Sequence, residues 1–303
     1  MSVNSVTVVG SVALDTIEAP EGKVGEVLGG SALYFGAAGT LFAPVHIVGV
    51  VGDDFPEEKF QTLVAKGVNV NCVEKVPGKT FRWHGRYYQD INRRETLSLD
   101  LGVFANFVPR LSPSASQAKA LMLANIDPQL QADVLEQMTQ PTFVAYDTMN
   151  HWIEERRREV EQMVKKVDIV FLNEEELFLL MQNTNLVKSA NRLLELGPRY
   201  VVVKRGAYGA CLFIKDKVPF LCPAFPLDRP IDPTGAGDSF AGGLLGYLVA
   251  TGEITDYNLR RAVVYGTIVA SFTVEGFGLS RLERLTIDEV EERFRKFQSM
   301  VEF

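Results

Sequence analysis

Short apolar runs alternate along this chain with segments of helical pattern, and this alternation restricts the possible folds more than any other feature. Near-continuous runs of Val, Ile, Leu and Phe are typical of strands that are buried on both faces. Six such runs, most of them closing at Gly, Asp or Asn, are Val6–Gly10, His46–Gly52, Ala120–Ile126, Phe143–Asp147, Asp168–Asn173 and Tyr200–Gly206. Strand and helix in regular succession predict a parallel sheet with helices on both faces.

The expected helices follow these strands or fall between them. Their predicted bounds are Ser31–Phe42, Glu57–Lys66, Ile153–Lys165, Glu174–Gln182, Val187–Leu196, Gly237–Thr251, Tyr257–Phe272 and Ile287–Met300. A chain of 303 residues is long for one domain, but a large α/β domain with a small accessory piece often has this size. We therefore expect a doubly wound α/β fold with a mostly parallel sheet, in which residues 1–303 form a single domain.

Two segments, Thr16–Gly30 and Gly78–Phe107, interrupt the alternation. Both have β-like patterns with alternating polar residues, and neither contains a helix that would connect two parallel strands. We expect them to pair as a small sheet that stands off the main domain. Long insertions in a compact domain usually serve as lids or binding elements. This small sheet is therefore expected to be a mobile lid, and it is also the expected contact of a homodimer.

Composition and charge argue against several classes of protein. Hydrophobic residues make up 47% of the chain and charged residues 23%, and the formal net charge is -7. An acidic chain of ordinary globular composition argues against a general binder of nucleic acid or of anionic membranes. No apolar run approaches the roughly 18 residues that span a bilayer, and the N-terminal residues lack the basic region of a signal peptide. The three cysteines, Cys72, Cys211 and Cys222, suggest neither a disulfide framework nor a zinc site, so the expected location is the cytoplasm.

The stretch IDPTGAGDSFAGG, Ile231–Gly243, combines several glycines with two aspartates just before an apolar helix. A glycine-rich turn at a helix N-terminus points backbone N–H groups at an anion, and the helix dipole adds to their attraction. Asp238 in the first turn would repel a simple anion, but an enzyme that removes a proton from a hydroxyl attacking a phosphate needs such a carboxylate. From the residues alone, a helix-capping Asp238 with glycines kept for packing is an equal alternative.

The stretch DPTGAGDSFAGGLL, Asp232–Leu245, resembles the C-terminal signature of the ribokinase-like kinases, also called the PfkB carbohydrate kinase family. Further segments resemble family motifs in the same order: GSVALD at Gly10–Asp15, GGSALY at Gly29–Tyr34, VGVVGDDF at Val48–Phe55, NEEE at Asn173–Glu176 and KRGAYGA at Lys204–Ala210. The resemblance covers essentially the whole chain. It implies a kinase that uses ATP and Mg²⁺ to phosphorylate a hydroxyl of a small sugar, cyclitol or nucleoside, on a doubly wound core with a β-sheet lid. The rival hypothesis is a binding or regulatory protein of this fold that has lost catalysis.

The resemblance also assigns roles at the glycine turn. Asp238 would be the catalytic base that faces the acceptor hydroxyl. Its amide would form the hole for the transferring γ-phosphate together with Gly235, Ala236 and Gly237. Pre-organised donors at a developing charge usually contribute more to catalysis than any other single effect, and phosphoryl transfer depends mainly on positioning and charge stabilisation.

The resemblance assigns further residues to the nucleotide and the metal ions. Asn173 and Glu176 have the spacing of a capping box, which alone would explain both residues. In the family the same pair helps to hold Mg²⁺ and the phosphates, and Glu176 would act through a water molecule. Asp232 and Thr234 fall where many relatives hold a monovalent cation such as K⁺. Three residues would border the nucleotide: Lys204, Gly206 and Gly209. Lys204 is equally explained as a surface charge at a strand end.

Four residues near the N-terminus are expected to bind the acceptor. Asp15 is predicted to end the first strand, and the resemblance makes it a bidentate acceptor for substrate hydroxyls, with a solvated loop acid as the alternative. Gly29 and Gly30 would let the backbone approach the same substrate. Tyr34 departs from the family pattern, which usually has Asn at this position, so ribose is a less favoured substrate. Tyrosine here would narrow the pocket and favour a ring that lies on an aromatic face, unless it only fills the core.

Overall fold

The computed structural model describes residues 4–90 and 93–302, and within these residues the centre is a nine-stranded sheet with the order β13-β12-β11-β10-β9-β8-β1-β4-β5. Its strands are β1 (Val6–Val9), β4 (Val45–Gly52), β5 (Val68–Val76), β8 (Ala120–Leu123), β9 (Phe143–Asp147), β10 (Ile169–Asn173), β11 (Tyr200–Lys204), β12 (Ala210–Ile214) and β13 (Phe220–Cys222). Neighbouring strands from β11 to β5 in this order run parallel, whereas β12 and β13 are antiparallel additions at one edge. The predicted doubly wound, mostly parallel sheet is confirmed.

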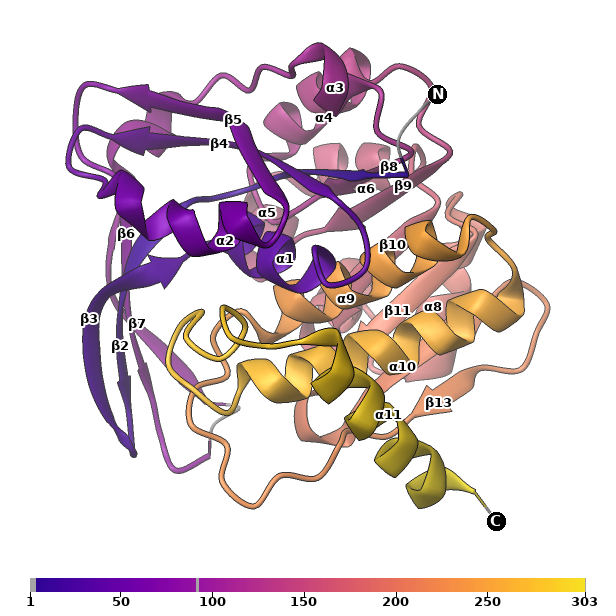
Figure 1. Cartoon of the computed structure of the whole chain (residues 1–303). Coiled ribbons are helices and arrows are strands. Elements are labelled where there is room, and N and C mark those ends of the chain that lie inside the picture. Colours follow the sequence, from indigo (N-terminus) through magenta and orange to yellow (C-terminus); the bar gives the residue numbers. More distant parts are fainter. Residues whose placement is uncertain (1–3, 91–92, 303) are drawn as a thin grey trace.

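Helices cover both faces of the main sheet (Figure 1). One core cluster receives buried side chains from α1 (Ser31–Gly39), α2 (Gln61–Ala65), α9 (Ala236–Thr251), α10 (Asp256–Thr273) and α11 (Ile287–Val301). The other receives them from α3 (Pro113–Ser116), α4 (Pro128–Gln137), α5 (Asn150–Glu155), α6 (Arg157–Val164), α7 (Glu174–Met181) and α8 (Leu186–Glu195). Neighbouring strand residues such as Phe143 and Val144 enter opposite clusters, which explains why these strands are apolar throughout. In the part of the chain that the structure describes, no helix is long and apolar enough to cross a membrane.

Some elements differ from the sequence-based expectation. The helix expected at Ile153–Lys165 is divided into α5 and α6, because the backbone of Arg156 leaves the helical region with φ -133° and ψ 36°. The helix expected at Glu57–Lys66 begins as a 3₁₀ turn. The apolar pattern predicts neither β5, an edge strand in which only Val68 and Cys72 are fully buried, nor α4, a short helix with three buried residues.

The two segments that interrupt the alternation form a separate four-stranded sheet, which we call the small sheet, with the order β3-β2-β6-β7. Its strands are β2 (Ala13–Ala19), β3 (Gly22–Gly29), β6 (Phe81–Tyr87) and β7 (Arg94–Asp100). The pairs β2–β3 and β6–β7 are antiparallel, and β2 pairs with β6 in parallel. The predicted pairing of the two segments is therefore confirmed, and Figure 1 shows the small sheet standing at one side of the main sheet.

Candidate active site

The carboxyl ends of neighbouring parallel strands bring polar residues to one edge of the main sheet. Asp147 is the last residue of β9, Asn173 of β10 and Lys204 of β11. Asn173 and Lys204 are also register partners in the pairing of β10 with β11. Open α/β sheets bind their ligands outside these strand ends. The glycine turn before α9 reaches the same place, because Gly237 lies against the Lys204 side chain.

The turn before α9 has the backbone that its glycines predict. Gly235 is the N-cap of α9 and has left-handed dihedral angles, with φ 72° and ψ 3°, which glycine adopts far more easily than other residues. A Cβ on Gly237 would lie 3.3 Å from the Nζ of Lys204, so a side chain would crowd the space before the helix. The Ala236 amide donates to the Pro233 carbonyl at 3.1 Å and is therefore already engaged within the turn.

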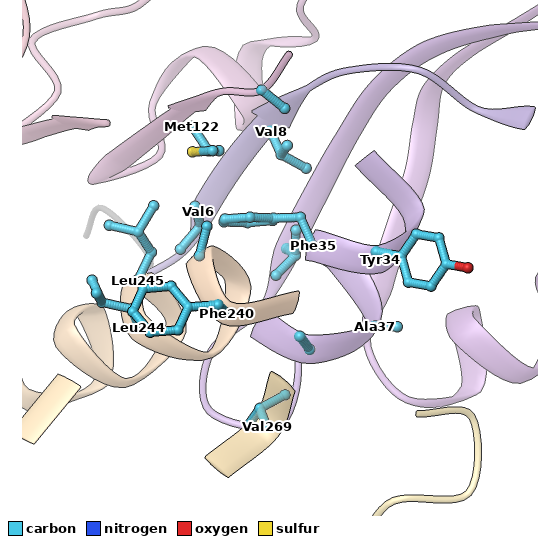
Figure 2. Packing of buried hydrophobic residues seen from close by; sticks show 14 of the residues in the cluster. Val6, Val8, Tyr34, Phe35, Ala37, Met122, Phe240, Leu244, Leu245 and Val269 are labelled. Atoms are coloured by element: carbon cyan, nitrogen blue, oxygen red, sulfur yellow. The ribbon is translucent and has the colours of Figure 1, made fainter. Parts of the chain in front are cut away.

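The ring of Tyr34 packs against this turn. A Cβ on Gly235 would lie 2.2–2.3 Å from three ring atoms of Tyr34, so only glycine fits above the ring. Figure 2 shows the Tyr34 ring pointing away from the side of α1 that carries Phe35. The Tyr34 hydroxyl is buried and has no hydrogen-bond partner among the described residues. Burial, with the nearby charges of Asp232 and Asp15, holds the pKa of this hydroxyl well above its usual value.

Asp15 lies in the small sheet. The prediction that it ends the first strand is wrong. The main-sheet strand β1 ends at Val9, and Asp15 is the third residue of β2. The register between β2 and β3 shifts just after it, and such irregularities re-aim side chains beside functional sites. The Asp15 carboxylate fills the space beside Gly29, where a Cβ would lie 1.8 Å from Oδ2. The backbone N–H of Gly30 also hydrogen-bonds to this carboxylate.

The electrostatic surroundings of Asp15 are unfavourable to its charge. Its side chain is 3% exposed, and Oδ1 has no hydrogen-bond partner among the described residues. Burial, followed by repulsion from Asp232 and Asp238, raises the pKa of Asp15 to about 8. A buried carboxyl with an open oxygen is suited to a ligand that donates hydrogen bonds, because those donors would stabilise the ionised form.

Lys204 is paired and largely buried. Its Nζ lies 2.8 Å from Oδ2 of Asp147, and the two side chains are 20% and 5% exposed. Burial acts to lower the pKa of Lys204, but the charges of Asp147 and Glu176 outweigh it, so the pKa is raised. Sequence reasoning missed Asp147. The run FVAYD nevertheless places an acid at the carboxyl end of a buried strand, which is the signal that could have identified it.

Asn173 and Glu176 form the capping box that their spacing predicts. Asn173 Oδ1 accepts from the Glu176 amide at 2.8 Å, and Glu176 Oε2 accepts from the Asn173 amide at 2.7 Å. Burial raises the pKa of Glu176 to about 7, against the opposing effect of Lys204. Because the cap uses Oε2, the other carboxylate oxygen of Glu176 is left for a further interaction.

Asp238 occupies the first turn of α9. Burial, followed by repulsion from Asp147, raises the pKa of Asp238 to about 7, although Lys204 acts in the opposite direction. A carboxyl group with a pKa near the working pH is well matched to general base catalysis. Asp238 also contributes to the raised pKa of Asp15, so the fold brings these two distant acids into one electrostatic environment.

A cavity of about 450 Å³ opens beside the glycine turn, a volume within the usual range for small-molecule sites. Its lining includes the predicted residues Lys204, Gly206 and Gly209 on one side and Ala236 and Gly237 on another. The rest of the lining is mainly apolar and comprises Ala207, Ala210, Ala224, Phe225, Pro226, Leu227, Pro230, Pro233, Phe240, Thr267, Ala270, Ser271 and Val274. Asn173 and Glu176 are not part of this lining.

Asp232 and Thr234 hold the turn to its surroundings. Asp232 Oδ1 accepts from the Thr234 amide at 2.9 Å, and Oδ2 accepts from the Gly278 amide at 3.0 Å. The Thr234 hydroxyl donates to the hydroxyl of Tyr87 on β6 at 3.1 Å, which joins the turn to the small sheet. These bonds occupy both carboxylate oxygens of Asp232, and a monovalent cation beside them stays a prediction.

Comparison with known proteins places this geometry in a family. A family model described as pfkB family carbohydrate kinase matches residues 3–284. A cytidine kinase of Thermococcus kodakarensis is 31% identical over 245 residues, which cover 78% of this chain and 86% of that protein. The crystal structure of the nucleoside kinase of Methanocaldococcus jannaschii, an archaeal member of the ribokinase family, matches with a TM-score of 0.78 at 21% identity, covering 97% and 99% of the two chains.

A further solved structure has the same fold. It is an aminoimidazole riboside kinase from Salmonella enterica in complex with aminoimidazole riboside and an ATP analog, and it matches with a TM-score of 0.76 at 20% identity. The match covers 96% of this chain and 99% of that chain. The chain therefore belongs to the pfkB family of carbohydrate kinases and is a phosphotransferase that acts on hydroxyl groups.

Proposed function

We propose that this protein transfers the γ-phosphate of ATP to a hydroxyl of a nucleoside, with Asp238 as the general base. The observation that carries the proposal is the position of Asp238 in the first turn of α9, directly after Gly237, which lines the cavity together with Lys204. Nucleosides are favoured over free sugars and cyclitols because the cytidine kinase, at 31% identity over 78% of this chain, acts on a nucleoside.

The chain's own residues would carry the transfer in a simple sequence. Asp238 takes the proton of the acceptor hydroxyl as its oxygen attacks the γ-phosphorus, and the bond to the departing ADP breaks. The Gly237 amide, at the positive end of the α9 dipole, would donate to the phosphoryl oxygens. A pKa of about 7 leaves a large fraction of Asp238 ionised at neutral pH while keeping it basic enough to accept a proton.

Asp15 would hold the acceptor. Two neighbouring hydroxyls of a ribose ring would donate to its carboxylate, which would satisfy the open Oδ1 and stabilise the charged form. Gly29 would serve the acceptor site indirectly, because the Asp15 carboxylate occupies the space where its Cβ would lie, and a Cβ on Gly30 would meet the Ser11 carbonyl. Tyr34 would contribute its buried hydroxyl, since its ring is already engaged with Gly235.

Mg²⁺ fits the arrangement as an ion held mainly by phosphates and water. Among the described residues, no group of three His, Cys, Asp or Glu side chains could enclose a metal ion. Nucleotide-bound Mg²⁺ keeps several waters and needs only one or two carboxylates. Glu176, whose cap uses one oxygen only, would accept a hydrogen bond from such a water. When bound, Mg²⁺ would neutralise charge on the phosphates, and K⁺ near Asp232 and Thr234 is part of the same proposal.

The deciding experiment is an ADP-release assay over a panel of nucleosides, free sugars and cyclitols. We expect turnover with ATP and Mg²⁺, with nucleosides as the best acceptors. Asp238→Asn should lower kcat by at least about 10²-fold, the usual contribution of a general base, with nucleotide affinity unchanged. A variant with near-wild-type kcat would remove Asp238 from the mechanism. Measurable ligand binding without any turnover would favour the rival hypothesis of an inactive binding protein.

Two further expectations belong to this proposal. A homodimer through the small sheet is supported by the exposed side chains of Leu99 on the outer strand β7 and of Leu101 just after it. Light scattering of the purified protein would measure its mass. A cytoplasmic location fits an ATP-dependent enzyme whose three cysteines are free and buried.

A further inference from the structure

The cavity beside the glycine turn has a charged region and an otherwise largely apolar lining. Lys204 and Gly237 lie against each other at the charged region, where a cation and a helix N-terminus suit the phosphates of a nucleotide. The base would then lie against the rest of the lining. Helix α10 contributes two hydroxyl groups to that part, from Thr267 and Ser271. They are four residues apart and therefore lie on the same side of the helix.

The Ser271 hydroxyl is fixed as a hydrogen-bond acceptor toward the cavity. Arg293 on α11 donates from Nη1 to the Ser271 Oγ at 2.9 Å, and a guanidinium has no acceptor that could receive the serine proton in return. The Ser271 hydroxyl therefore donates to the Ile268 carbonyl, 2.6 Å away. A hydroxyl has one proton and two acceptor positions. Among the described residues no other group bonds to this oxygen, so a ligand finds one open acceptor position there and no donor.

Arg293 is itself held in place from several sides. Its Nη2 donates to Oε1 of Glu275 at 2.7 Å, and its side chain is 15% exposed. The guanidinium lies 3.4 Å from the centroid of the Phe272 ring and 4.9 Å from that of Phe225, which lines the cavity. A largely buried guanidinium with an ion pair and two aromatic contacts has little freedom to leave Ser271. The direction of the serine proton is therefore set before any ligand binds.

Thr267, one helix turn before Ser271, has no such fixed polarity. Its hydroxyl donates to the Val263 carbonyl at 3.0 Å and also lies 3.4 Å from Sγ of Cys222, where either atom can be the donor. The threonine proton thus has two possible partners, and the oxygen can present a donor or an acceptor. Ser271 is therefore the hydroxyl that can distinguish one base from another.

We propose that Ser271, oriented by Arg293, makes the cavity selective for a donor nucleotide whose purine carries an amino group at position 6. This inference rests on the proposed function, in which ATP occupies the cavity. The 6-amino group of adenine donates hydrogen bonds and would satisfy the open acceptor position of Ser271. Hypoxanthine and guanine carry a carbonyl oxygen at this position, and two acceptors that face each other in an apolar cavity both stay unpaired.

The selectivity should act on binding and not on the transfer step, because the base is remote from the reacting phosphorus. ATP and ITP should therefore differ in KM, with similar kcat. Arg293 is a positioning residue in this scheme, since it acts on the base through Ser271.

Equilibrium binding of ADP and IDP, measured by calorimetry, tests the selectivity without requiring catalysis. We expect the wild type to bind ADP roughly tenfold to a hundredfold more tightly than IDP, the usual effect of leaving a buried polar group unpaired. Ser271→Ala should bind the two with nearly equal affinity. Thr273→Val is the matched control, because Thr273 is a buried residue of the same helix whose hydroxyl donates to the Val269 carbonyl at 3.3 Å, outside the cavity lining. The control should keep the wild-type ratio.

Two variants of Arg293 separate orientation of Ser271 from a merely structural role. Lysine also donates without accepting, so Arg293→Lys should keep most of the preference for ADP. Arg293→Met removes the donor and frees the Ser271 proton to turn toward a carbonyl oxygen, so the affinity for IDP should rise relative to that for ADP. A lower melting temperature of Arg293→Met with an unchanged ratio would overturn the role given to Arg293.

Three results would overturn the selectivity itself: equal affinity of the wild type for ADP and IDP, a wild-type ratio in Ser271→Ala, or the same loss of preference in Thr273→Val. A wild type that binds neither nucleotide would overturn it as well, because the cavity would then not be a nucleotide site. Selective binding of ADP without turnover of any acceptor would instead refute the proposed kinase function and support the selectivity.

Discussion

Asp15→Asn should stabilise the free protein at alkaline pH while weakening its activity. Asparagine has nearly the shape of a protonated aspartate, can still accept from the Gly30 amide, and cannot ionise. The pKa of Asp15 is raised from 3.8 to about 8, so the folded state keeps a proton that the unfolded state loses in this interval. Wild-type stability should therefore decline as the pH rises from about 4 to about 8, and the variant should escape that decline.

The size of this stability difference follows from the same pKa interval. At about 1.4 kcal/mol per pH unit, ionising Asp15 at its buried site costs at most about 6 kcal/mol. Structural relaxation and water entry reduce such penalties, so we expect the variant to gain about 1–3 kcal/mol at about pH 8. For a chain of this size that corresponds to a rise in Tm of roughly 2–10 °C. The difference should shrink steadily toward about pH 4, where both proteins carry an uncharged group.

Thermal and denaturant unfolding across this pH range measure the effect. Asp216→Asn is the matched control, because Asp216 is an exposed acid in the turn after β12 and has a φ of 58° that asparagine also tolerates. The control should show no pH-dependent difference from the wild type. A stability difference for Asp15→Asn that does not change with pH, or a loss of stability at about pH 8, would refute the reasoning. In the activity assay the same variant should lose roughly tenfold to a hundredfold in acceptor kcat/KM, since it lacks a charged acceptor.

Three further predictions concern the base, the turn and the small sheet. Because the pKa of Asp238 is raised to about 7 and a base must be deprotonated, kcat/KM should rise with pH and level off above about pH 7; a profile already flat at about pH 5 would contradict this. Tyr34→Phe should lower acceptor kcat/KM with little change in Tm, because only the hydroxyl is lost, whereas Tyr34→Asn should change the ranking of acceptors and lower Tm by leaving a cavity under Gly235. If neither variant alters the ranking of acceptors, Tyr34 is a packing residue. Amide exchange in residues 16–30 and 78–107 should slow when the acceptor binds, as expected of a lid that excludes water. Amide exchange that is already fully protected in the free protein would indicate a rigid sheet instead.

Local patterns in the sequence were sufficient for much of the fold. Strands such as Phe143–Asp147 are apolar throughout because both faces are buried, and that property can be read from consecutive residues. The capping box of Asn173 and Glu176 was predictable because its partners are three residues apart on one helix turn. The left-handed Gly235 turn could also be predicted, because its geometry depends on the residues that form it.

Elements with weak local patterns escaped prediction. The helix expected at Ile153–Lys165 breaks at Arg156, and no Pro or Gly in the sequence marks that break. The edge strand β5 buries only part of its residues, so its alternation is weak. In both cases the tertiary contacts of the segment decide its backbone, and a single-sequence pattern does not contain them.

The sequence by itself determined the class of fold, the glycine turn and the presence of an acid beside it. Only the tertiary structure decided which groups share the site: Asp15 in the small sheet near Asp238, the Tyr34 ring on Gly235, and Asp147 on Lys204. The physical reason is that burial and mutual charge set the pKa values and pairings of these groups. Burial and mutual charge depend on how the strand ends and the small sheet pack against each other. The residues involved are far apart in the chain, so no local sequence pattern predicts these contacts.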